Sequence, residues 1–188
     1  MLKVAITGNI ASGKSKAELI IAKYYPVYDT DKIAHEILDN ITEFYGYDVF
    51  TDGKIDRKKL GDLVFNNHEL KTKLEELVHP KIRENLLEIF KAHKRDKMVF
   101  ISVPLLFEAG FKDMFDKTIL ISAKENLRLK RLMARNNFTR EEALKRIKSQ
   151  MSENLKKEYV DYVITNNADF ETLETQVKQV LKLLKNKR

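Results

Sequence analysis

The sequence of 188 residues contains no cysteine and no tryptophan, and only 6 glycines and 3 prolines. Without cysteine, the chain can form neither disulfides nor thiolate zinc sites, and it has no cysteine nucleophile. No apolar run approaches the roughly 18 residues of a membrane-spanning helix. The N-terminus, MLKVAITGNI, lacks the charged region, long apolar stretch and cleavage site of a signal peptide. These absences favour a soluble, cytoplasmic protein without flexible linkers.

The charge balance is basic, with 35 lysines and arginines against 28 acidic residues and a formal net charge of +7. Such a surplus suits anionic partners, which include nucleotides, coenzyme phosphates, nucleic acids and anionic lipids. A solvated, lysine-rich surface explains the same balance, so charge alone leaves the partner open. A chain of this length is expected to form one domain with at most a modest insertion.

Five short apolar runs predict buried β-strands, and helical patterns separate them. The predicted strands are Leu2–Thr7, Val27–Asp29, Met98–Val103, Thr118–Ser122 and Tyr162–Thr165. The predicted helices are Ser15–Tyr24, Lys32–Leu38, Glu125–Arg135 and Phe170–Leu184. Strands that alternate with helices indicate an α/β fold in which a parallel sheet is covered on both faces.

The stretch from residue 40 to residue 97 departs from this alternation. It contains no convincing strand, and its pattern predicts helices over Lys58–Phe65, Glu69–Leu77 and Ile82–His93. Pro80 then stands at the start of the last of these helices, where proline is a structural device. We therefore expect a helical insertion between the second and third strands.

Residues 8–15 match the phosphate-binding loop pattern G-x-x-x-x-G-K-[ST] at every fixed position. The glycines let the backbone wrap so that successive N–H groups point at phosphate oxygens, and the following helix directs its positive end at the same anion. Lys14 would reach the β- and γ-phosphates, and the Ser15 hydroxyl would ligate Mg²⁺. A chance glycine-rich turn would require neither the preceding strand nor the following helix, and both are predicted. The loop predicts nucleoside triphosphate binding by Gly8, Asn9, Ile10, Ala11, Ser12, Gly13, Lys14 and Ser15.

Two acidic residues, Asp29 and Asp31, lie at the end of the second predicted strand. Ligands of open parallel sheets bind at the carboxyl ends of strands, so either carboxylate could accept a proton from an attacking hydroxyl, as the base of a kinase does. Alternatively, both are caps of the helix that starts at Lys32, since aspartate is a favoured N-cap. After the third strand, Pro104 stands where many proteins with this loop have a metal-binding aspartate. Glu108 either reaches the site or is a surface carboxylate.

Two further features have both a functional and a structural interpretation. His79 could contact a substrate, although a lone histidine is more often structural. On a helix, Arg128, Arg131 and Arg135 share one face, and arginines of this kind bind a transferring phosphoryl group when a lid closes. A solvated basic face is the alternative. The next helical stretch, Arg140–Lys157, is predicted to begin at a capping box.

Taken together, these motifs resemble those of the dephospho-coenzyme A kinase family. The resemblance runs from the first strand to the last helix, and the order and spacing of the strings make it specific. The strings are TGNIASGKS, Asp29-x-Asp31 with Ile33-Ala34, Asp52 to Arg57 with Leu60, Val78-His79-Pro80-Lys81-Ile82, Val103 to Glu108, Leu129-Lys130-Arg131 with Arg135, Arg146-Ile147 with Gln150, and Asn166-Asn167.

The resemblance implies a reaction in which the ribose 3′-hydroxyl of dephospho-coenzyme A attacks the γ-phosphate of ATP. Asp31 would be the base, and Asp29 would support Mg²⁺ or the strand end. Lys14 and Arg135 would stabilise charge on the phosphoryl group. The other nucleotide-binding residues implied are Lys16, Arg131, Arg146 and Asn167, and the acceptor-binding residues implied are Asp31, Arg57, His79, Lys81 and Glu108.

The fold implied is that of nucleotide kinases, with a five-stranded parallel sheet, a helical substrate-binding insertion over residues 40–97 and a lid over residues 124–157, all within one domain of residues 1–188.

Asn9 and Ala11 stand where the family has glycine, and Lys16 stands where it has threonine or serine. Because alanine is unstrained only at negative φ, the loop is expected to allow a negative φ at Ala11.

Two other functions remain possible: a different small-molecule or nucleoside kinase, and a nucleotide-dependent protein that binds nucleic acid. The chain has no aromatic-rich basic stripe of the kind single-strand binders use. We expect dephospho-coenzyme A as the partner, no nucleic acid and no membrane, and a monomer or weak homo-oligomer.

Overall fold

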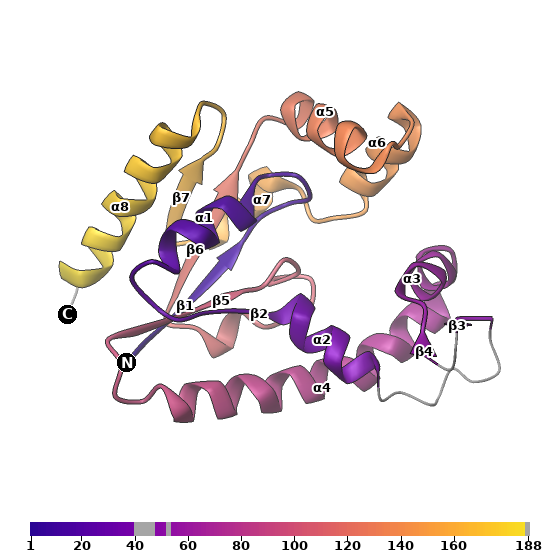
Figure 1. Ribbon diagram of the computed structural model, residues 1–188, viewed down its shortest axis with the longest axis horizontal. Coiled ribbons are helices and arrows are strands. Elements are labelled where there is room, and N and C mark those ends of the chain that lie inside the picture. The colour runs from indigo at the N-terminus through magenta and orange to yellow at the C-terminus, as the bar shows by residue number, and fades with distance from the viewer. Residues whose placement is uncertain (40–47, 52–53, 187–188) are drawn as a thin grey trace. The chain divides into compact units, whose positions relative to one another are not determined.

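The computed structural model describes residues 1–39, 48–51 and 54–186. Asp52 and Gly53, which belong to one of the resembling strings, lie outside the described residues. The chain forms two compact units, one of residues 1–29 and 93–188 and the other of residues 30–92. Figure 1 shows the helices and strands of both units.

The first unit contains a five-stranded sheet in which the strand order is β2-β5-β1-β6-β7 and every neighbouring pair is parallel. The strands are β1 (Leu2–Thr7), β2 (Val27–Asp29), β5 (Met98–Ser102), β6 (Lys117–Ser122) and β7 (Tyr162–Thr165). The predicted parallel sheet is confirmed, and only β5 and β6 differ from the predicted bounds, each at one end. Because β1 lies in the middle and the chain continues to both sides of it, the carboxyl end of β1 is the switch point where such sheets bind ligands.

The helices of the first unit are α1 (Lys14–Ile21), α5 (Glu125–Asn136), α6 (Arg140–Lys148), α7 (Glu153–Tyr159) and α8 (Phe170–Asn186), with a short 3₁₀ turn, η1 (Lys112–Met114).

The predicted capping box is present, since the Thr139 side chain accepts from the backbone of Glu142 and the Glu142 side chain accepts from Thr139. The helical stretch predicted over Arg140–Lys157 consists of two helices with a break at residues 149–152. The Ser152 side chain caps α7 by accepting from the Leu155 N–H.

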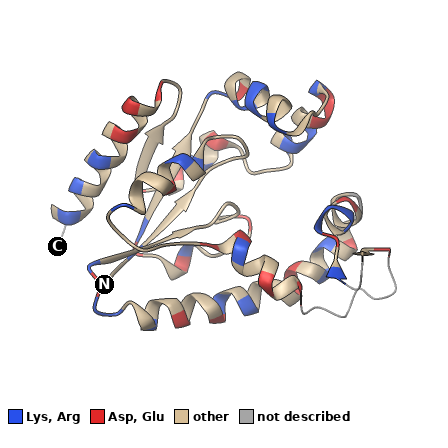
Figure 2. Cartoon of the chain, viewed as in Figure 1, with Lys and Arg blue, Asp and Glu red and all other residues tan. Residues whose placement is uncertain are grey.

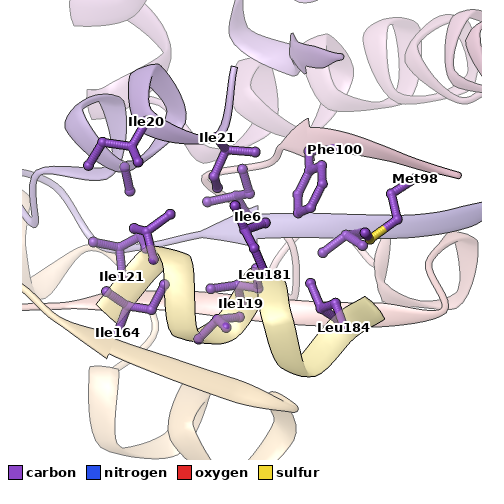
Figure 3. Packing of buried hydrophobic residues seen from close by; sticks show 14 of the residues in the cluster. Ile6, Ile20, Ile21, Met98, Phe100, Ile119, Ile121, Ile164, Leu181 and Leu184 are labelled. Atoms are coloured by element: carbon purple, nitrogen blue, oxygen red, sulfur yellow. The ribbon is translucent and has the colours of Figure 1, made fainter. Parts of the chain in front are cut away.

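The main hydrophobic core lies where α1 and α8 pack against one face of the sheet (Figure 3). Alternate residues of the strands, such as Ile6, Phe100 and Ile119, face these helices and are fully buried. Their neighbours Ala5 and Leu120 are equally buried, so both faces of the sheet are covered. Each fully buried isoleucine or phenylalanine contributes about 1.5–3 kcal/mol, and this packing fixes the strand ends from which the loops of the site emerge.

The second unit consists of helices and one short hairpin. Its elements are α2 (Thr30–Leu38), β3 (Phe50–Thr51), β4 (Lys54–Ile55), α3 (Arg57–Asn66) and α4 (His68–Ala92). Both α2 and α3 pack against α4, and the Asp56 side chain caps α3 by accepting from the Lys58 and Lys59 N–H groups.

Two expectations for this stretch are wrong. The antiparallel pair β3–β4 was not expected, because strands of two residues are too short to show an alternating pattern. The predicted break before Ile82 is also absent, since α4 continues through Pro80. Proline removes one helical hydrogen bond, but Val78, Ile82 and Leu86 on the same helix are buried, and this packing keeps the helix continuous.

Charged residues lie mainly in the helices, while few belong to the strands of the large sheet (Figure 2). Among the described residues, no helix combines the length and hydrophobicity required to cross a membrane.

Candidate active site

The loop of residues 8–13 connects the carboxyl end of β1 to the start of α1. It turns through a hydrogen bond from the Ser12 N–H to the Asn9 carbonyl, at 3.0 Å. The N-cap residue of α1 is Gly13, no side chain caps the helix, and its first turn has no acidic residue. The first N–H groups of α1 are therefore available to an anion, which the helix dipole attracts.

The two motif glycines are required by close contacts. At Gly13, φ is +89°, and a Cβ would lie 2.0 Å from Nδ2 of Asn166. A Cβ on Gly8 would lie 2.7 Å from Oγ of Ser12 and 2.8 Å from the Ile121 carbonyl oxygen. Neither position accepts a larger residue without displacing the loop.

Ala11 adopts a φ of +60°, so the expected negative φ is wrong. The left-handed conformation costs a residue with a Cβ about 1–2 kcal/mol. Ala11 and Ile10 pack against a small apolar cluster formed by Leu129, Leu132, Ala143 and Ile147 of α5 and α6. This contact offsets part of the strain and joins the loop to the two helices.

Polar groups from three segments distant in the sequence hold the outer surface of the loop. Asn166, which follows β7, donates from Nδ2 to the Ser12 carbonyl at 2.7 Å. Arg131 of α5 bridges the same two residues, donating to the Ser12 carbonyl at 3.5 Å and to the Asn166 carbonyl at 3.1 Å. The linker after α6 provides the other contacts, since Gln150 Oε1 accepts from the Ile10 N–H at 2.8 Å and the Met151 carbonyl accepts from the Asn9 side chain at 2.9 Å.

Lys14 is held by two groups. Its ammonium donates to Glu18 Oε1 at 2.8 Å and also to the Ser102 hydroxyl. The Lys14 and Glu18 side chains are each only 14% exposed, so the carboxylate balances a poorly hydrated charge. Asp29 is the register partner of Ser102 on the neighbouring strand. The carboxyl ends of β1, β2 and β5 thus bring Lys14, Ser102 and Asp29 to one edge of the sheet.

Sequence reasoning missed Glu18 and Ser102. The spacing of four residues between Lys14 and Glu18 on one helix was the available signal for Glu18. Ser102 ends a buried strand, as Asp29 does, and this position was its signal. Ser15 and Lys16 lie in the first turn of α1, and Lys16 is exposed.

The predicted lid arginines have different surroundings. Arg131 contacts the loop, whereas Arg135 is exposed and donates to Asn136 at 2.8 Å. Arg146 of α6 lies over the Phe138 ring, 4.7 Å from its centroid. Arg128 is 4% exposed, donates to the Ala123 carbonyl at 3.2 Å and lies 3.9 Å from Glu153, so it belongs to the interior rather than to the exposed face that the spacing suggested.

Two of the predicted site residues contact segments distant in the sequence. Glu108 accepts from the Met151 N–H at 3.1 Å and forms an ion pair with Lys156 at 2.9 Å. Lys156 is completely buried, which the sequence did not suggest. Asn167 accepts from the Lys124 N–H at 2.8 Å. Glu108 therefore anchors the linker that contacts the loop.

The second unit contains the remaining predicted residues. Asp31 is exposed in the first turn of α2, two residues after Asp29 in the sequence. Arg57 begins α3 and lies 3.3 Å from Asp39. His79 and Lys81 belong to α4.

The pKa of His79 lies below its usual value of 6.5, chiefly because burial disfavours the charged ring; the nearby charge of Glu75 opposes this effect and that of Arg83 adds to it. The imidazole is therefore neutral at neutral pH. Among the described residues, no group of three or more histidine or acidic side chains could hold a metal ion, so protein side chains there provide at most part of a metal's coordination.

Comparison with known proteins gives one consistent result. A family model described as dephospho-CoA kinase matches residues 2–172. A dephospho-CoA kinase from Oceanobacillus iheyensis is 38% identical over 96% of each chain, and one from Listeria monocytogenes is 36% identical over 97% of this chain and 95% of the relative.

Solved structures agree with the family match. A dephospho-CoA kinase from Campylobacter jejuni has a TM-score of 0.74 and 33% identity, covering 99% of this chain and 98% of its own. A protein from Thermus thermophilus has a TM-score of 0.83 and 36% identity, covering 97% of both chains. A shikimate kinase from Bacteroides thetaiotaomicron has a TM-score of 0.60 at 17% identity over 98% of both chains, which shows the fold alone.

Glu18→Gln is expected to strengthen ATP binding. The carboxylate 2.8 Å from the Lys14 ammonium is expected to compete with a phosphate for that cation, and removing such an ion pair on a helix changes the free energy by up to about 1 kcal/mol. The dissociation constant of Mg-ATP should fall about fivefold in titration calorimetry, and the gain should shrink at high salt.

Glu174→Gln on α8 is the matched control, because it removes a carboxylate that also pairs with lysines, Lys23 and Lys178. Its ATP affinity should equal that of the unsubstituted protein. Unchanged or weaker ATP binding by Glu18→Gln would show that the carboxylate positions Lys14 and does not compete for it.

Proposed function

The chain belongs to the dephospho-CoA kinase family. We propose that residues of its first unit bind the phosphates of ATP and that mainly residues of its second unit bind the acceptor. The protein transfers the γ-phosphate of ATP to the ribose 3′-hydroxyl of dephospho-CoA, giving CoA and ADP. The observation that carries the division of roles is the uncapped start of α1, with Lys14 at its first position.

The first role is binding of the ATP phosphates. The free N–H groups at the start of α1 suit them, and Ser12 Oγ, which is buried and has no hydrogen-bond partner among the described residues, lies in the same loop. Lys14 exchanges Glu18 for the β- and γ-phosphates. Arg131, Arg146 and Asn167, together with Lys16, line the nucleotide, and Arg135 reaches the γ-phosphate from the lid.

Oxygen donors are what Mg²⁺ prefers, and this ion usually binds to one or two protein groups and the substrate's phosphates. The Ser15 hydroxyl and the Asp29 carboxylate are two protein oxygen ligands of the kind that this pattern requires. When bound, Mg²⁺ neutralises charge on the β- and γ-phosphates.

The second role is activation of the acceptor. Asp31 accepts the proton of the 3′-hydroxyl while the oxygen of that hydroxyl forms a bond to the γ-phosphorus. The bond from that phosphorus to the β,γ-bridging oxygen breaks, and ADP leaves with the electron pair. Lys14 and Arg135 stabilise the charge that moves with the phosphoryl group.

The third role is acceptor binding, through Arg57, His79, Lys81 and Glu108. Arg57 and Lys81 offer positive charge to the phosphates of dephospho-CoA. His79 is neutral and offers a hydrogen bond without charge. The proposed partners are small molecules and not nucleic acid, and a monomer or weak homo-oligomer remains a prediction.

The test of this function is ADP release from Mg-ATP with dephospho-CoA, compared with adenosine, AMP and pantetheine phosphate as acceptors. Turnover confined to dephospho-CoA is expected. Turnover with another acceptor at an equal rate would contradict the acceptor assignment and leave the kinase fold. No turnover with any of these acceptors, despite ATP binding, would contradict the function.

Asp31→Asn should lower kcat by about 10²–10⁴, the range for a lost general base, while the dissociation constant of ATP changes little. Steady-state kinetics and calorimetry separate the two effects. Glu36→Gln is the control, because it removes an exposed carboxylate from the same helix. If Asp31→Asn changed only ATP affinity, Asp31 would bind the metal or support the fold instead.

A further inference from the structure

Lys156, on α7, is a fully buried lysine to which the chemistry described above gives no role. Its Nζ lies 2.9 Å from Glu108 Oε1 and donates to the Pro104 carbonyl at 3.5 Å. Both partners lie in the segment that follows β5. A buried ion pair loses much of its hydration, and apolar residues in its place are often equally or more stable. Stability alone therefore does not explain a lysine at this position.

The first connection from this lysine to the phosphate loop runs through its carboxylate partner. Glu108 Oε1 also accepts from the Met151 N–H at 3.1 Å, and the Met151 carbonyl accepts from the Asn9 side chain at 2.9 Å. In the same linker, Gln150 Oε1 accepts from the Ile10 N–H at 2.8 Å. The position of the linker therefore determines where the acceptors for two polar groups of the loop lie.

The second connection runs through the carbonyl partner. The Pro104 carbonyl accepts from the Thr7 hydroxyl at 3.2 Å as well as from the ammonium. Thr7 is fully buried and is the last residue of β1, directly before Gly8, where the loop begins. The two acceptors of Lys156 are thus bonded to the entry of the loop and to the linker that holds its outer surface.

We infer that Lys156 is a positioning residue for nucleotide binding, which holds the phosphate loop through these two connections. The inference rests on the proposed function, in which this loop binds the phosphates of ATP. An ammonium has three donors, so one lysine can bind the carboxylate and the carbonyl together. Hydrogen bonds from a charged donor are stronger than neutral ones. Without this charge, the nucleotide must order the loop as it binds, which lowers its apparent affinity.

Lys156→Met tests the inference, because methionine is unbranched and flexible and has no charge. The Kd of a non-hydrolysable ATP analogue with Mg²⁺, measured by titration calorimetry, should rise about tenfold, which corresponds to one lost charge-assisted hydrogen bond. In steady-state kinetics the KM for ATP should rise by the same factor, while kcat and the KM for dephospho-CoA stay within about threefold. A Kd does not depend on the fraction of folded protein, so partial unfolding cannot produce this result.

Lys117→Met is the matched control. Lys117 also pairs with a carboxylate distant in the sequence, Asp161 at 2.7 Å, but it begins β6, at the amino end of the strand. Its loss should leave the Kd of the ATP analogue unchanged. Thr7→Val is a second variant, which breaks one connection and removes no charge. It should raise the Kd about threefold, and less when Lys156→Met is already present, since both changes act through the Pro104 carbonyl.

Unchanged affinity of Lys156→Met for the ATP analogue, whatever its unfolding midpoint, would overturn the inference and leave Lys156 a purely structural residue. A higher KM for dephospho-CoA with unchanged ATP affinity would also overturn it, because Lys156 would then orient Glu108 toward the acceptor. Equal weakening by Lys117→Met would do the same. If Lys156→Met does not fold, an unchanged Kd for Thr7→Val is the contradicting result. Failure of the unsubstituted protein to bind the analogue would instead contradict the proposed function, and the inference with it.

Discussion

A backbone that turns its N–H groups toward a phosphate must have its remaining polar groups satisfied by other parts of the chain. This constraint organises the first unit. The Ser12 carbonyl is held by Asn166 and Arg131, and the Ile10 N–H by Gln150. The left-handed conformations of Ala11 and Gly13 are held by the same surroundings. Because Arg131 lies within α5 and Gln150 follows the end of α6, these contacts connect the loop to both helices.

Two poorly exposed lysines of the first unit are each paired with a carboxylate. Lys14 is paired with Glu18, and the fully buried Lys156 is paired with Glu108. The two pairs have different roles. Lys14 is the first residue of α1, which no side chain caps, and in the function proposed above a phosphate replaces its carboxylate partner. Lys156 has no exposed surface, and losing Glu108 would leave a buried charge uncompensated. Glu108 also binds the Met151 N–H, so this pair anchors the linker that supports the loop.

The sequence predicted the sheet well because its strands are mainly apolar runs, and β1, β2 and β7 have the predicted bounds. The phosphate loop was equally predictable, since its spacing is set by local geometry. Features that depend on distant contacts were not predicted. The burial of Lys156 depends on a carboxylate 48 residues earlier, the burial of Arg128 on Glu153, and the division of residues 140–157 on a cap at Ser152. The positive φ of Ala11 became clear only with the packing of α5 and α6, because nothing in an alanine residue itself favours that conformation.

Phosphoryl transfer by the loop is the central claim, and turnover of Lys14→Ala tests it most directly. ADP release with Mg-ATP and dephospho-CoA should be measured beside the thermal unfolding midpoint, with Lys23→Ala, an exposed lysine just beyond the end of α1, as the control. Loss of a preorganised cation that stabilises the transition state lowers kcat by roughly 10²–10³. The account predicts at least this loss for Lys14→Ala with little change in the midpoint, and normal turnover for Lys23→Ala. Normal turnover by a folded Lys14→Ala protein would contradict it.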